Sequence, residues 1–135
     1  MSRGIGAFCE LEIQDEDTVI YKYGSYNLNE QKYRNKDYIA DGIITILKCS
    51  LIEPEIHDKI KRFPNGKKKR IVKRIPKEVM LSDLFKNKLV TVENCSNCWE
   101  TYKNGVDVMA ENIIRNIFME YQRNGILPEN LSIHK

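Results

Sequence analysis

Two thiols stand three positions apart in the stretch ENCSNCWETY, residues 93–102, beside the single tryptophan of the chain. A pair of cysteines at this spacing on a tight turn can bind one tetrahedral zinc ion through both thiolates. A complete zinc signature needs a second pair, whereas Cys9, Cys49 and the two histidines each stand alone. We therefore predict a structural turn at Cys95 and Cys98 and no cofactor, with a structural zinc site completed by Cys49 or Cys9 as the alternative.

A redox function for the Cys95–Cys98 pair is the least favoured interpretation. In thioredoxin-like sites the first cysteine opens a helix, whose N-terminus lowers the pKa of the thiol. Here the polar stretch WETYKNG follows, and its glycine argues against an immediate helix. Cys9 and Cys49 fall in phase with apolar strand residues, which predicts that both are buried as small hydrophobic side chains.

Residues 59–77 hold ten Lys/Arg side chains and no acidic one. Such a segment can neutralise phosphates or another acidic partner. A mundane alternative is that lysines on an edge strand block aggregation. A third is pairing with the acidic segment 1–56, which has six Lys/Arg against ten Asp/Glu, or with a second subunit. The candidate binding residues are Lys67, Lys68, Lys69, Arg70, Lys73 and Arg74.

Aromatic side chains give two further candidate surfaces. Trp99 and Tyr102 are the candidates for an exposed interaction patch. Five tyrosines could stack on nucleic-acid bases if they share one surface, although tyrosine on sheets commonly packs in a core. These are Tyr21, Tyr23, Tyr26, Tyr33 and Tyr38.

The composition predicts an ordinary globular protein. At 135 residues, with 41% hydrophobic and 30% charged residues, the sequence fits one domain spanning residues 1–135. No apolar run approaches the roughly 18–20 residues of a membrane span, and the first residues lack the apolar core of a signal peptide. We therefore expect a cytoplasmic protein with reduced cysteines and no membrane partner.

Hydrophobic periodicity predicts the elements that must position these residues. Alternating or β-branched runs predict strands at 4–13, 18–26, 42–52, 67–75 and 88–95, with a long polar loop at 27–41. Helical spacing predicts a short helix at 54–63 and a short helix or turn at 76–87, the second with Ser82 as a candidate N-cap. A long helix is predicted at 106–124, where Asn104 and Asp107 resemble a capping box and Gly125 ends it.

These elements predict an α+β fold, in which a long C-terminal helix covers one face of an antiparallel-dominated sheet of about five strands. No nucleotide-binding, metalloprotease or nucleophile-elbow pattern is present. His57, in the short helix, and His134, where we expect fraying, leave little room for acid–base catalysis. We expect a non-catalytic binding domain whose partner is another protein or a second copy, as in a homodimer. Nucleic-acid binding through 59–77 is the first alternative, and a small metal- or thiol-dependent enzyme is the second.

Overall fold

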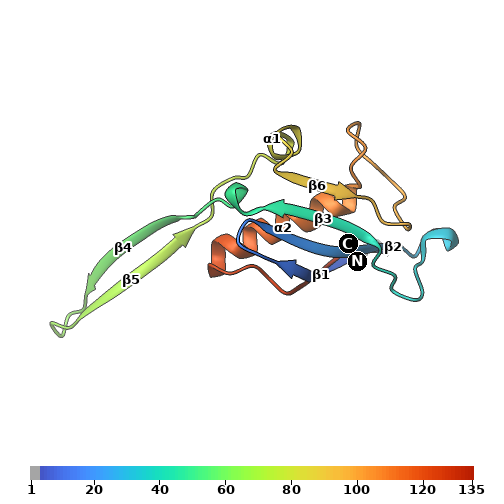
Figure 1. Cartoon of the computed structure of the whole chain (residues 1–135). Helices are drawn as coiled ribbons and strands as arrows, with labels where there is room; N and C mark the ends of the chain where they lie inside the picture. Colours follow the sequence, from blue (N-terminus) through green and yellow to red (C-terminus); the bar gives the residue numbers. More distant parts are fainter. Residues whose placement is uncertain (1–3) are drawn as a thin grey trace.

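The computed structural model describes residues 4–135 and contains an antiparallel sheet, a separate hairpin and one long helix, which confirms the predicted α+β class (Figure 1). The strands are β1 Ile5–Gln14, β2 Thr18–Asn27, β3 Gly42–Leu47, β4 Glu55–Arg62, β5 Lys68–Ile75, β6 Val90–Glu93 and β7 Asn130–His134. The α-helices are α1 Leu81–Lys86 and α2 Val108–Asn124, and short 3-10 turns occur at η1 Gln31–Tyr33 and η2 Lys48–Ser50.

The main sheet has five strands in the order β6-β3-β2-β1-β7, and every neighbouring pair is antiparallel. Side chains alternate between its two faces because successive residues of a strand point in opposite directions. Val19, Tyr21 and Tyr23 are completely buried on one face, as their spacing predicts. The intervening residues of β2 lie on the opposite, uncovered face.

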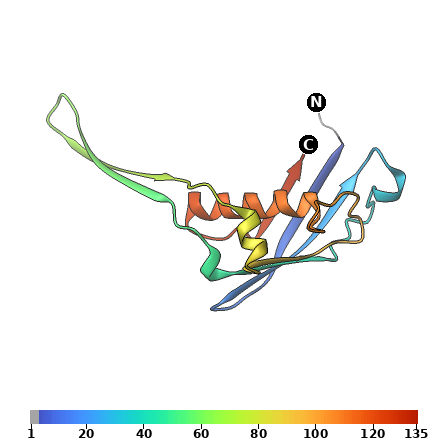
Figure 2. The ribbon, with the colours of Figure 1, turned by 90° about the horizontal axis from the view of Figure 1, so that it is seen from above.

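Helix α2 lies across the inner face of this sheet (Figure 2). Asp107 caps its first turn by accepting a hydrogen bond from the backbone N–H of Met109 at 3.0 Å. Gly125 ends the helix with a left-handed φ of 76°, the conformation that glycine adopts at least cost. The apolar side of the helix completes the core with Met109, Ala110, Ile113, Ile114, Ile117 and Phe118.

The predicted helix at 54–63 is wrong, because this segment forms strand β4 and pairs with β5 along eight residues. Ile56, Ile60 and Phe63 do have helical spacing, but Ile56 and Ile60 also lie an even number of positions apart, so a strand would place both on one face equally well. Local pattern cannot choose between the two. Backbone pairing with β5 supplies hydrogen bonds that a short isolated helix would have to provide alone.

Four smaller predictions about the same elements also need correction. Ser82 lies inside α1, whose N-cap is Met80, and Asn104 instead accepts a bond from the N–H of Val106. Cys49 is exposed, because the chain leaves strand β3 for the turn η2 before reaching it. His134 does not fray, since β7 pairs with β1.

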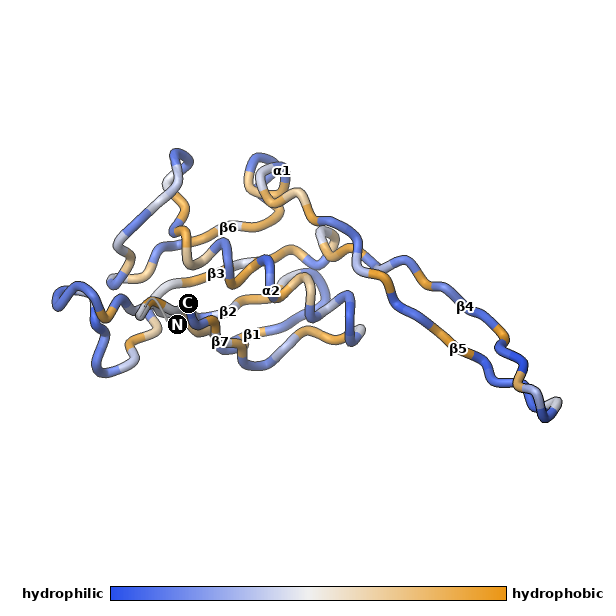
Figure 3. The backbone as a smooth tube through the Cα atoms, turned by 180° about the vertical axis from the view of Figure 1, so that it is seen from behind, coloured by the Kyte–Doolittle hydropathy of each residue, from blue (hydrophilic) through white to orange (hydrophobic). Residues whose placement is uncertain are grey.

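The hairpin of β4 and β5, residues 55–75, extends away from the rest of the molecule, and we call it the arm (Figures 1 and 3). Eight residues per strand give it a length of roughly 25 Å. A two-stranded ribbon buries no core of its own, so the arm depends on its base for support.

The base of the arm is attached to the C-terminal end of α2. The buried Gln122 side chain accepts from the backbone N–H of Lys77 at 2.6 Å and donates to its carbonyl at 2.9 Å. The Arg74 guanidinium donates to the Gln122 carbonyl at 2.8 Å, where the helix dipole favours a cation. Tyr121 donates to Glu53 at 2.5 Å.

None of the helices within residues 4–135 has the length and apolar character needed to cross a membrane.

Candidate functional site

The register of the arm sorts its side chains onto two faces, because directly opposed residues of an antiparallel pair lie on the same side. One face holds the opposed pairs Glu55–Ile75, His57–Lys73, Lys59–Ile71 and Lys61–Lys69, and its one carboxylate, Glu55, pairs with His57 at 2.8 Å. We call the four exposed lysines Lys59, Lys61, Lys69 and Lys73 the lysine face. At its base this face points away from α2, because Arg74 reaches that helix from the opposite side.

The lysine face carries uncompensated charge. Among residues 4–135, no carboxylate forms an ion pair with any of its four lysines. Lys61 lies over the Phe63 ring at 5.8 Å, near the tip. A groove of about 420 Å³ is lined by Lys59, Lys61 and Lys73 of this face, together with His57, Ile71 and Ile75, and it also contacts Ile60, whose side chain belongs to the other face.

On the opposite face of the arm, an acidic side chain compensates part of the positive charge. Arg70 and Asp58 form a bidentate pair, with Nε at 2.9 Å and 3.0 Å from the two carboxylate oxygens. This pairing raises the pKa of the Arg70 guanidinium. Arg74 is bound to α2, so two of the predicted binding residues already have partners within the chain.

The six predicted binding residues therefore do not form one surface. Lys69 and Lys73 lie on the lysine face, Lys68, Arg70 and Arg74 lie on the other, and Lys67 lies in the turn. Strand β4 supplies Lys59 and Lys61 in place of the others. The regular alternation on both sides of the turn Asn65-Gly66 is the signal that could have identified these two lysines as partners of Lys69 and Lys73.

Cys95 and Cys98 lie in a tight turn that follows strand β6. A backbone hydrogen bond from the Cys98 N–H to the Cys95 carbonyl, 3.2 Å long, closes this turn. The Cys95 thiol shares a hydrogen bond with Ser25 at 3.3 Å and donates to Asp107 at 3.7 Å. The turn is thereby joined to both the sheet and the start of α2.

The two thiols of this turn are shielded to different degrees, since Cys95 is buried and Cys98 is partly buried. Burial, followed by the nearby Asp107 charge, raises the pKa of Cys98 to about 12. Burial also raises the pKa of Cys95. Both shifts lower the thiolate fraction at neutral pH, which opposes nucleophilic or redox reactivity.

The structure does not bring Cys9 or Cys49 into a metal-binding cluster with this turn. Within residues 4–135, no three His, Cys, Asp or Glu side chains are grouped so that they could hold a metal ion. Cys9 is buried as predicted, and its burial raises its pKa to about 12. Zinc binding stays a prediction, to be tested by metal content.

Neither set of aromatic residues predicted to form an exposed surface lies together as a whole. Trp99 is half-buried with its ring 6.5 Å from that of Tyr33, whereas Tyr102 is 44% exposed. Tyr21 and Tyr23 are in the core, where Tyr21 donates to the Pro128 carbonyl at 2.6 Å.

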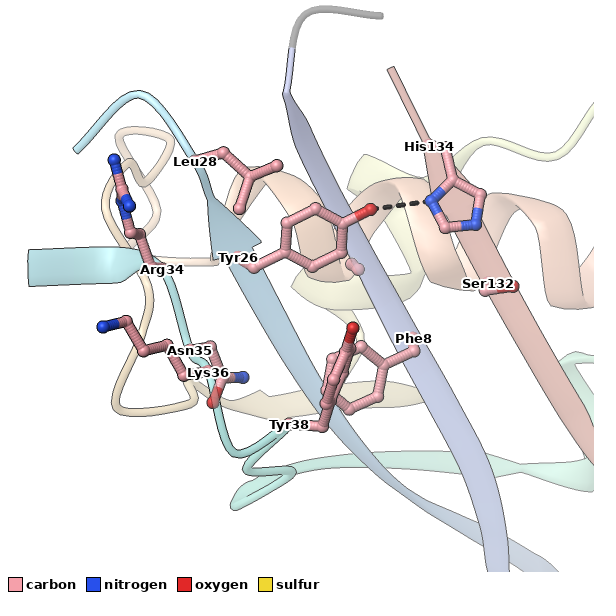
Figure 4. Close-up of a pocket in the computed structure, with 10 residues that line it drawn as sticks. Phe8, Tyr26, Leu28, Arg34, Asn35, Lys36, Tyr38, Ser132 and His134 are labelled. Atoms are coloured by element: carbon pink, nitrogen blue, oxygen red, sulfur yellow. Dashed lines mark hydrogen bonds between the residues drawn. The ribbon is translucent and has the colours of Figure 1, made fainter. Parts of the chain in front are cut away.

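Tyr26 and Tyr38 lie together at a pocket on the uncovered face of the sheet, with a cavity volume of about 450 Å³ (Figure 4). Its other lining residues come from β1, the 27–41 loop and β7: Ala7, Phe8, Leu28, Arg34, Asn35, Lys36, Ser132 and His134. Sequence reasoning missed most of them because they are distant along the chain.

Two glycines shape the floor of this pocket. Gly24 stands opposite Phe8 and Gly6 opposite Tyr26 in the β1–β2 register, so each aromatic ring lies against a residue without a side chain. A Cβ on Gly24 would lie 2.1 Å from the carbonyl oxygen of Ile39, and one on Gly6 would lie 2.4 Å from the Tyr26 hydroxyl. Such aromatic–glycine cross-strand pairs are the sequence signal that could have located the pocket.

Comparison with known proteins gives no match, since no family model, no curated protein and no solved structure is significantly similar to this chain.

Proposed function

We propose that the chain is a non-catalytic binding domain whose arm binds the phosphates of double-stranded DNA through the lysine face. The observation that carries the proposal is the row of four exposed lysines on one side of a projecting ribbon, none of them paired with a described carboxylate. Arm residues 55–75 contain nine Lys/Arg and two Asp/Glu, a balance of +7, against −4 for the rest of a chain whose net charge is +3.

The shape of the arm favours B-form DNA over double-stranded RNA. The major groove of B-DNA, about 12 Å wide, admits a two-stranded β-ribbon. The major groove of an A-form RNA duplex is deep and too narrow for side chains to read. A ribbon roughly 25 Å long reaches along most of one helical turn of about 34 Å.

The expected affinity depends steeply on salt, because each neutralised phosphate releases a counterion. Four phosphate contacts predict a slope of about −3.6 for log K against log salt concentration, from about −0.9 per contact on B-DNA. Between 50 and 200 mM salt, affinity should then fall about 150-fold.

The test measures fluorescence anisotropy of a labelled DNA duplex over this salt range, with an RNA duplex of the same sequence in parallel. Substitution of Lys59, Lys61, Lys69 and Lys73 by Gln should remove most of the binding and of the salt slope. The matched control substitutes Gln at Lys86, Lys103, Arg115 and Arg123, which changes the net charge equally but lies off the arm. Equal losses in the two variants, or binding insensitive to salt, would refute the proposal.

A second candidate function is self-association through the other face of the arm. There Ile56, Ile60 and Val72 are 57%, 69% and 55% exposed, an unusual amount of aliphatic surface on one short ribbon. Packing two such faces together would leave both lysine faces outward. Sedimentation equilibrium should then detect a dimer that Ile60→Thr weakens. A monomer at every concentration tested would exclude this candidate.

A further inference from the structure

The pocket on the uncovered face of the sheet is separate from the arm. The 27–41 loop supplies part of its lining. This loop lies at the end of the molecule opposite the arm (Figures 1 and 2). Its volume of about 450 Å³ falls within the range of roughly 300–1,000 Å³ typical of small-molecule sites.

One wall of the pocket is an aromatic pair made of the half-buried Phe8 and the exposed Tyr38. The Phe8 and Tyr38 ring centroids are 5.9 Å apart and tilted by 59°. Tyr38 is 72% exposed, so most of its ring is free to receive a flat ligand. Its backbone φ of 52° is left-handed, a genuine outlier for a bulky residue, and such strain clusters at ligand sites.

The loop side of the pocket is cationic. Arg34 and Lys36 are exposed there, across from the aromatic rings (Figure 4). Neither forms an ion pair with a described carboxylate, and none of the described residues lining the pocket is acidic. Their combined charge of +2 matches a phosphate monoester, which carries about −1.5 to −2 at pH 7.

The walls are held in place before any ligand arrives. The Asn35 side-chain amide donates to the carbonyls of Ser25 at 3.1 Å and Ile39 at 3.0 Å, and its oxygen accepts from the Ile39 N–H at 2.7 Å. These bonds attach the loop to β2. Across the pocket, the Tyr26 hydroxyl and His134 Nδ1 share a hydrogen bond of 2.7 Å. Preorganisation of this kind lowers the entropic cost of binding.

We propose that this pocket binds a nucleotide, with the base stacked on Tyr38 and a terminal phosphate monoester held by Arg34 and Lys36. The shared chemistry is a planar heteroaromatic ring carrying a dianionic group. It is found both in a free mononucleotide and at a 5′-phosphorylated strand end. The proposal does not rest on DNA binding by the arm, because it uses none of the arm's residues.

The test is isothermal titration calorimetry of the full chain with AMP, adenosine and inorganic phosphate. AMP should bind more tightly than either fragment, because only AMP has both the ring and the charge. Substituting Gln at both Arg34 and Lys36 should reduce AMP binding to the level of adenosine and leave adenosine unchanged. No binding of AMP at millimolar concentration, or equal binding of AMP and adenosine, would overturn the proposal.

Tyr38→Asn tests the stacking wall without threatening the fold, because asparagine tolerates the left-handed backbone that tyrosine strains. Base–aromatic stacking is worth about 1–3 kcal/mol, so AMP affinity should fall about 5- to 150-fold. The urea midpoint should be no lower than that of the unmodified chain. The matched control is Tyr102→Asn, a similar change at an exposed tyrosine outside the pocket. Unchanged AMP affinity in Tyr38→Asn would refute the stacking role.

A 5′-phosphorylated tetranucleotide and its unphosphorylated form distinguish the two sources of ligand. If the phosphorylated strand binds as tightly as AMP, the site takes strand ends; if it binds more weakly, the site takes free nucleotides. The four-lysine variant of the arm must bind AMP normally, and a loss there would contradict the independence of the two sites.

Discussion

Asp107 connects the Cys95–Cys98 turn, the sheet and helix α2, and its removal should be among the most damaging single changes. The carboxylate is 1% exposed. One oxygen accepts from the N–H of Met109 at 3.0 Å, and the other accepts from the Tyr23 hydroxyl at 2.9 Å. That hydroxyl in turn accepts from the N–H of Cys95 at 3.0 Å. Burial and the Asp107 charge raise the pKa of Tyr23 well above its usual value, so it stays a donor.

Two costs add in Asp107→Ala. Loss of an N-cap costs about 1 kcal/mol. Leaving the buried Tyr23 hydroxyl without its acceptor costs about 1–3 kcal/mol more. The expected loss of about 2–4 kcal/mol is a large part of a typical unfolding free energy of about 5–15 kcal/mol. Asp107→Asn can accept from only one of these two donors. Its oxygen either caps the helix, which leaves an amide donor facing Tyr23, or accepts from Tyr23, which removes the cap. Its loss of stability should therefore lie between zero and that of Asp107→Ala.

Urea unfolding of the unmodified chain, Asp107→Ala, Tyr23→Phe and the double variant gives the assay. In the Tyr23→Phe background no hydroxyl donor remains, so Asp107→Ala should cost only the cap and the weak bond from the Cys95 thiol, and the coupling energy should be at least about 1 kcal/mol. Asp17→Ala, at an exposed carboxylate, is the control and should change stability by less than about 0.5 kcal/mol. A coupling energy of zero would refute the proposed connection.

Three further predictions concern the exposed Cys49 thiol, the buried Cys9 thiol and the base of the arm. Cys49 alone is exposed among the four cysteines, so one thiol per chain should react rapidly with a disulfide reagent at neutral pH, and Cys49→Ser should abolish this fast phase. The raised pKa of buried Cys9, about 12, adds stability that is complete below about pH 8.5 and is lost as pH rises toward 12. Its slope, at most about 1.4 kcal/mol per pH unit, should disappear from the alkaline stability curve of Cys9→Ala. Gln122→Ala leaves both backbone groups of Lys77 without their partners. It should cost about 1–3 kcal/mol and speed hydrogen exchange of the Lys77 amide, whereas Gln14→Ala on the exposed end of β1 should change neither.

Much of the fold was predictable because its signals are local. Alternation in β1 and β2 reports which side chains share a face, and this depends only on the two-residue period of a strand. The long helix was predictable because Gly125 and Asp107 mark its ends, although the cap is Asp107 alone. The class of fold therefore followed from short-range chemistry.

The candidate sites were less predictable, because both depend on which segments pair. The charge of 59–77 was evident, but the lysine face exists only through the register that places Lys61 opposite Lys69. Pairing also placed the exposed Arg70 beside Asp58, which compensates its charge.

By itself, the sequence determined five of the seven strands within residues 4–135, the main helix, the burial of Cys9 and the concentration of basic charge, since each is written in the period or composition of a short segment. It missed β4, which it predicted as a helix, and β7, which completes the main sheet in place of the predicted strand at 67–75. Tertiary structure alone decided that 55–62 is a strand, that Cys49 is exposed and that His134 meets Tyr26 across the sheet. The physical reason is the same in each case. Backbone hydrogen bonds and buried surface come from partners distant along the chain, and no local pattern records where those partners lie.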